Sequence, residues 1–85
     1  MAQKPNASWL IDEVAEFLAR GPTRRELLSH RPSRYAQDRY TALVSKLKSG
    51  SLSADEEWEL NQFEHLEVLM QAIKARLRSR PAVPS

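Results

Sequence analysis

The sequence predicts an all-α protein, a small helical bundle of three shorter helices and one long C-terminal helix with a coiled-coil-like seam. Three observations support this prediction: apolar residues recur at spacings of three and four, capping residues precede the candidate helices, and the only two glycines fall where helices should end. With 85 residues and no cysteine, the chain suits one domain without a disulfide framework or a thiolate metal site.

The first helix is expected over residues 8–19. Asn6 or Ser8 can serve as its N-cap, and apolar side chains then follow at helical spacing. Gly21 and Pro22 should end this helix, because glycine readily adopts a left-handed C-cap and proline cannot continue the hydrogen-bond ladder.

Two shorter helices should follow. Thr23 and Glu26 have the spacing of a capping box, in which the hydroxyl and the carboxylate each accept a free backbone N–H. This short helix should end before Pro32, because proline disfavours helical geometry at the preceding residue. Ser33 is the expected cap of a third helix over residues 34–48, which should form a hairpin with the first half of the fourth helix.

A fourth helix is expected from Ser53 to about Ser79. Ser53 and Glu56 form a second capping box, and neither glycine nor proline interrupts the chain before Pro81. Such a helix is roughly 40 Å long, whereas a compact domain of this size is only about 30 Å wide. We therefore expect the fourth helix to overhang its own domain. Trp58 is expected to pack inward against the first or the third helix.

The fourth helix carries an apolar stripe with alternating spacings of three and four. The stripe consists of Phe63, Leu66, Met70, Ile73 and Leu77, and Leu69 widens it. An exposed seam of large apolar side chains needs a cover, which a second copy of the chain or a different protein would supply. Lys74, Arg76 and Arg78 would set the orientation of that partner at the rim.

The remaining segments and the composition complete the expected organisation. Residues 1–7 should be a flexible arm, residues 8–80 a single helical domain, and residues 81–85 a disordered tail. No stretch approaches the length of an apolar membrane span, and the first eight residues lack the apolar core of a signal peptide. We therefore expect a soluble cytoplasmic protein that does not bind membranes.

Catalytic, metal-binding and cofactor-binding functions lack a sequence signature. His30 and His65 are the only histidines, and neither belongs to a Glu-x-x-His pair of the kind that carboxylate-bridged metal sites use. The two glycines do not form a phosphate-binding loop. We predict no enzymatic activity, no metal, no cofactor and no small-molecule substrate. His30 should lie near a helix C-terminus, where a cation is favoured.

The charges are segregated along the chain, although the formal net charge is only +2. Six acids and no Lys or Arg lie between Asp55 and Glu67. An arginine cluster precedes them, and it consists of Arg20, Arg24, Arg25, Arg31, Arg34 and Arg39. This cluster can contact phosphates of a nucleic acid. Alternatively, it can pair with the acidic segment of the folded or assembled protein, and we favour that interpretation.

One resemblance adds a biological setting. Leu52-Ser53-Ala54-Asp55-Glu56-Glu57, Glu64-His65-Leu66 and Lys74-Ala75-Arg76-Leu77-Arg78 resemble the corresponding segments of a group of small bacterial helical proteins of unassigned biochemistry. That group often has proline at the position of Ala54, a difference that does not disturb the cap. Its members tend to be encoded just ahead of a nuclease-like or toxin-like partner. The resemblance implies an antitoxin-like or accessory-subunit role.

These observations lead to one functional prediction and one alternative. The chain is predicted to be a non-catalytic protein–protein interaction module, the antitoxin-like or accessory subunit of a bacterial effector. Its long C-terminal helix would bind the partner in helix-in-groove fashion. The alternative is a dimeric nucleic-acid-binding protein that presents the arginine cluster of residues 20–39 to phosphates.

Overall fold

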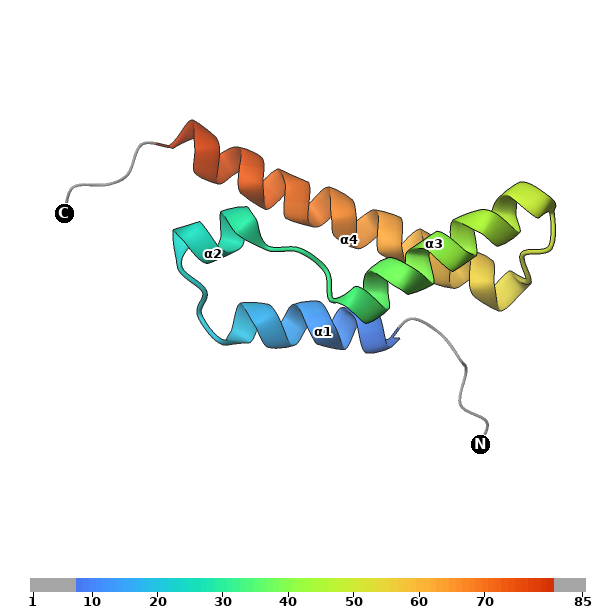
Figure 1. Cartoon of the computed structure of the whole chain (residues 1–85). Coiled ribbons are helices and arrows are strands. Elements are labelled where there is room, and N and C mark those ends of the chain that lie inside the picture. Colours follow the sequence, from blue (N-terminus) through green and yellow to red (C-terminus); the bar gives the residue numbers. More distant parts are fainter. Residues whose placement is uncertain (1–7, 81–85) are drawn as a thin grey trace.

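The structure is a computed structural model of the chain, and it describes residues 8–80 (Figure 1). Four helices follow one another, and their bounds are α1 (Ser8–Ala19), α2 (Arg24–Ser29), α3 (Arg34–Ser49) and α4 (Ala54–Ser79). The described residues contain no β-strand, so the all-α prediction is confirmed. The predicted bounds of the first, third and fourth helices agree with the structure to within one residue, and α2 follows the Thr23 cap and ends before Pro32 as predicted. The predicted arm, the Asn6 cap and the predicted tail lie outside the described residues.

Local capping chemistry sets the ends of these helices. The Thr23 hydroxyl accepts the Glu26 N–H at 3.1 Å, while the Glu26 carboxylate accepts the Thr23 N–H at 2.8 Å. Ser53 and Glu56 form the same reciprocal pair at the start of α4, at 3.1 and 3.0 Å. Gly50 ends α3 with φ at 75°, in the left-handed region that favours glycine. Both predicted capping boxes are therefore present.

Helix α4 forms the spine of the molecule. Figure 1 shows that α3 folds back along the N-terminal half of α4, whereas α2 lies beside its C-terminal half. The molecule extends over 52 × 32 × 18 Å, and its smallest dimension accommodates about two layers of helices. The predicted overhang of the long helix is wrong, because the three shorter helices are spread along α4 instead of gathering at one end.

The hydrophobic core is small. Its main cluster consists of Leu10, Ala36, Leu43, Leu60 and Phe63, with Leu43 completely buried. The Phe63 ring lies edge-on to Trp9 at a centroid separation of 5.8 Å and is tilted against Tyr40 at 5.5 Å. The core thus joins α1, α3 and the first half of α4.

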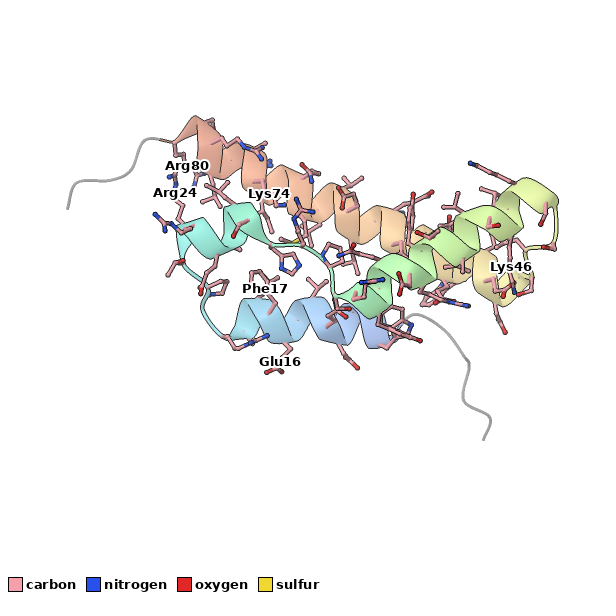
Figure 2. All side chains as sticks on the ribbon, in the orientation of Figure 1. Glu16, Phe17, Arg24, Lys46, Lys74 and Arg80 are labelled. Atoms are coloured by element: carbon pink, nitrogen blue, oxygen red, sulfur yellow. The ribbon has the colours of Figure 1, made fainter. Side chains whose placement is uncertain are left out.

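Three charged side chains form hydrogen bonds that connect one helix to the end of another. The Glu13 carboxylate of α1 accepts both the backbone N–H and the hydroxyl of Ser33, the cap of α3, at 3.0 and 2.8 Å. Lys74 Nζ of α4 donates to the carbonyl oxygen of His30 at 3.1 Å. Arg24 Nη2 of α2 donates to the Leu77 carbonyl oxygen at 2.7 Å, near the end of α4. Figure 2 shows Arg24 beside Arg80 at this end.

No helix within residues 8–80 combines the length and the apolar composition that crossing a membrane requires.

Candidate protein-binding surface

The predicted apolar stripe of α4 packs largely against its own chain. Phe63 and Met70 are buried, and Leu66, Ile73 and Leu77 are half-buried. Leu66 and Met70 face Leu10 and Val14 of α1 across a small cavity of about 70 Å³. The prediction that this stripe forms an open seam for another chain is wrong, because α1 and α2 pack onto α4 and cover the stripe in part.

Other apolar side chains of α4 remain at the surface. Val68 is 67 % exposed, Leu69 is 46 % exposed and Trp58 is 42 % exposed. The predicted inward packing of Trp58 is wrong, because Trp58 lies about 200° around the helix from the buried Leu60. Of the predicted rim residues, Arg76 and Arg78 are exposed, whereas Lys74 is half-buried and holds the His30 carbonyl. Among the apolar residues that were predicted to bind a partner, Leu69 is thus the one that is exposed.

An apolar groove of about 590 Å³ lies between α3 and α4, and we call it the α3–α4 groove. Its lining consists of Pro32, Ala36, Gln37, Tyr40, Thr41, Phe63, Glu64, Glu67 and Val68. Phe63 and Ala36 are buried, whereas Tyr40 and Val68 are exposed on opposite walls. The groove was not predicted, because it arises from the way α3 lies across α4.

The other side of the α3–α4 hairpin is closed by ion pairs, and we call it the ion-paired flank. Arg39 Nε and Nη2 each donate to one oxygen of the Glu59 carboxylate at 2.8 Å, which is a bidentate pair. Glu59 is only 6 % exposed. Arg39 Nη2 also lies 3.9 Å from Glu56 Oε2, and Lys46 Nζ donates to the same Glu56 oxygen. Figure 2 shows Lys46 near the hairpin loop.

Hydrogen bonds shift the pKa values of two residues on the ion-paired flank. The hydrogen bond to Glu59 raises the pKa of Arg39. The hydrogen bonds from Lys46 and from the Ser53 backbone lower the pKa of Glu56 to about 2. Arg39 and Glu56 are therefore both charged at neutral pH.

The arginine cluster does not act as one group in the structure. Arg24 is engaged with the C-terminal end of α4, and Arg39 is paired with the N-terminal half of that helix. Arg34 pairs with Asp38 at 3.2 Å on the exposed face of α3. The remaining members, Arg20, Arg25 and Arg31, are exposed. The interpretation that arginines pair with the acidic segment is confirmed for Arg39.

His30 occupies a half-buried position at the end of α2. Its imidazole stacks on Phe17 of α1 at a centroid separation of 4.1 Å, and Figure 2 shows Phe17 pointing from α1 towards α2. Burial lowers the pKa of His30, the charge of Lys74 lowers it further, and Glu13 partly opposes both effects. The expected cation at this helix end is therefore disfavoured, because the neutral imidazole suits the buried site better.

Between residues 8 and 80, no three side chains of the metal-ligating types His, Cys, Asp and Glu are grouped so that they could hold an ion. Each buried side-chain nitrogen or oxygen in that range has a hydrogen-bond partner. No family model, curated protein or solved structure matches this chain.

Proposed function

We propose that this chain is a non-catalytic protein–protein interaction module and acts as the antitoxin-like or accessory subunit of a bacterial effector. Helix α4 would supply the main binding surface. The observation that carries this proposal is the exposure of Trp58, Val68 and Leu69 on one continuous helix that spans the molecule. Val68 and Leu69 are adjacent, and a contiguous exposed apolar patch is typical of a surface that a partner covers.

The balance between buried and exposed apolar side chains also supports association. Among the residues that the structure describes, seven apolar residues are buried and seven large apolar residues are exposed. A chain of this size buries a smaller share of its surface than a larger domain does, so a partner that covers the exposed group would add stability. Association with a partner would thus stabilise this fold.

The proposed contact set differs from the seam expected from the sequence. Leu69 would be the central apolar anchor on one flank of α4, with the half-buried Leu66 and Ile73 beside it. Arg76 and Arg78 are exposed near the C-terminal end of the helix and would affect association rate and specificity.

Purification of the tagged full chain from the organism that encodes it tests this proposal. We expect a complex whose mass fits the chain plus one other polypeptide in a fixed ratio, and we expect Leu69→Asp to abolish it. Ser45→Asp adds the same charge at an exposed position of α3 and should leave the complex intact. Recovery of the wild-type chain alone, without a second polypeptide or a second copy, would contradict the proposal.

Nucleic-acid binding is a second candidate, and the exposure of Arg25, Arg31 and Arg34 around α2 and the start of α3 favours it. A salt titration separates it from protein binding. Affinity for a DNA duplex or an RNA hairpin that collapses between about 50 and 200 mM salt would support phosphate contacts. A protein complex that tolerates the same change would support the interaction module.

A further inference from the structure

The α3–α4 groove is an open trough with an apolar floor. The buried ring of Phe63 forms part of that floor, while Tyr40 of α3 and Val68 of α4 stand exposed on the two walls. The lining covers Ala36 to Thr41 on α3 and Phe63 to Val68 on α4, which is about 8 Å along each helix. Two apolar anchors one turn apart on a docking helix are about 6 Å apart and fit this length.

The groove carries negative charge without a balancing cation. Glu64 and Glu67 line it, and no Lys or Arg is among its described lining residues. Neither carboxylate takes part in an ion pair within residues 8–80, and Glu67 accepts a hydrogen bond only from Gln71, at 3.0 Å. By contrast, Glu56 and Glu59 on the ion-paired flank are both matched by cations. A bound segment with basic residues would complement the groove.

We propose that the α3–α4 groove binds a basic amphipathic helix of a protein partner, with apolar anchors over Phe63 and Val68 and Lys or Arg side chains on Glu64 and Glu67. This inference rests on the proposed function and names one interface within it. Gln37 and Thr41 on the α3 wall are exposed and can hydrogen-bond to polar groups of the same helix. Leu69 does not line the groove, so the groove is distinct from the Leu69 flank of α4.

Two synthetic peptides provide the probes. The basic peptide is an 18-residue helix with leucine at helical spacings of three and four and lysine elsewhere, and the acidic peptide has glutamate in place of every lysine. Fluorescence anisotropy of each labelled peptide is measured with the full chain at physiological salt. We expect the basic peptide to bind at least about tenfold more tightly, because the groove lining is acidic.

Adjacent residues of α4 provide a matched pair of variants. Val68 lines the groove, whereas Leu69 does not, and both side chains are exposed, so neither substitution should disturb the fold. We expect Val68→Ser to weaken binding of the basic peptide about fivefold through lost apolar contact. Leu69→Ser should change it less than twofold. The double variant Glu64→Gln/Glu67→Gln should weaken binding about tenfold while leaving the circular dichroism spectrum unchanged.

The outcomes separate this inference from the proposed function. If both peptides bind equally, or if the basic peptide does not bind, the groove proposal is wrong, while the complex recovered by co-purification is judged separately. If Leu69→Ser weakens binding of the basic peptide as much as Val68→Ser does, the peptide lies on the other flank of α4 and the groove proposal is again wrong. If the wild-type chain also purifies alone, the proposed function fails as well.

Discussion

On one flank of the α3–α4 hairpin, Arg39 and Lys46 of α3 hold the carboxylates of Glu59 and Glu56. On the other flank, Tyr40 and Val68 face solvent beside two carboxylates that make no ion pair within residues 8–80. The two flanks lie on either side of the same line of core contacts, which runs through Ala36, Leu43 and Phe63. The flanks differ in that the carboxylates of the first form ion pairs with side chains of the same chain, whereas those of the second form none within the described residues.

This difference separates residues that pair within the chain from residues that remain exposed to solvent. Five positions separate Glu59 from Glu64, which is a rotation of about 140° around α4. That rotation places the first carboxylate against Arg39 and the second beside the groove. A single acidic run in the sequence therefore contributes to folding on one flank and to the lining of an open groove on the other.

The largest effect should come from the core beneath both flanks. Leu43→Ala removes the one large side chain within residues 8–80 that is completely buried, and we expect a loss of about 3 kcal/mol in the free energy of unfolding. Leu47→Ala, one turn later at an exposed position of α3, should cost under about 1 kcal/mol. Urea denaturation followed by circular dichroism measures both. Equal losses would show that Leu43 is not the shared core residue.

The second effect tests the ion-paired flank. Arg39→Met leaves the buried Glu59 carboxylate without its bidentate partner, so we expect a loss of about 2 to 3 kcal/mol in the free energy of unfolding. Arg34→Met is the matched control, because Arg34 forms an exposed pair with Asp38 and should contribute at most about 0.5 kcal/mol. Urea denaturation of the two variants compares them directly. If Arg34→Met costs as much, the two flanks do not differ as described.

The third effect is a pH dependence that belongs to the same flank. In the folded chain the pKa of Glu56 is about 2, compared with 4.5 for an ordinary glutamate. The unfolded chain therefore binds a proton first as the pH falls, so this contribution to stability is complete above pH 4.5 and declines from there towards pH 2. Urea midpoints across that window should fall less steeply in Glu56→Gln. Glu64→Gln should retain the steeper wild-type fall, and an identical slope in both variants would contradict the assignment.

The smallest effect should appear on the groove flank. Glu64 makes no ion pair within the described residues, so Glu64→Gln should change the free energy of unfolding by under about 0.5 kcal/mol. Glu59→Gln removes the same charge from beneath Arg39 and should cost about 1 to 2 kcal/mol. Paired urea titrations distinguish the two. A Glu64→Gln variant as unstable as Glu59→Gln would mean that the groove carboxylate has a structural role.

The helices could be predicted from the sequence because their ends depend on neighbouring residues. The hydroxyls of Thr23 and Ser53 and the left-handed Gly50 each act within a few positions, so spacing alone locates them. The pairing of Arg39 with the acidic segment also followed from charge segregation, although the sequence could not identify Glu59 as its partner.

The binding surface could not be predicted in the same way, because periodicity identifies a helix face without identifying what covers it. The apolar stripe that includes Leu66 and Met70 was correctly placed on one side of α4, but α1 lies against it. Trp58 and Val68 remain exposed because only three short helices are available to cover a helix of 26 residues. The groove depends on how α3 lies across α4, which is a long-range property of the fold.

Backbone amide shifts of the isotope-labelled full chain, recorded by NMR as the basic peptide is added, test most directly whether this peptide binds in the α3–α4 groove. The largest shifts should fall on Gln37, Thr41, Glu64 and Val68, with little change around Arg39 and Glu59. Largest shifts on the ion-paired flank, or around Trp58 and Leu69, would contradict binding of this peptide in the groove.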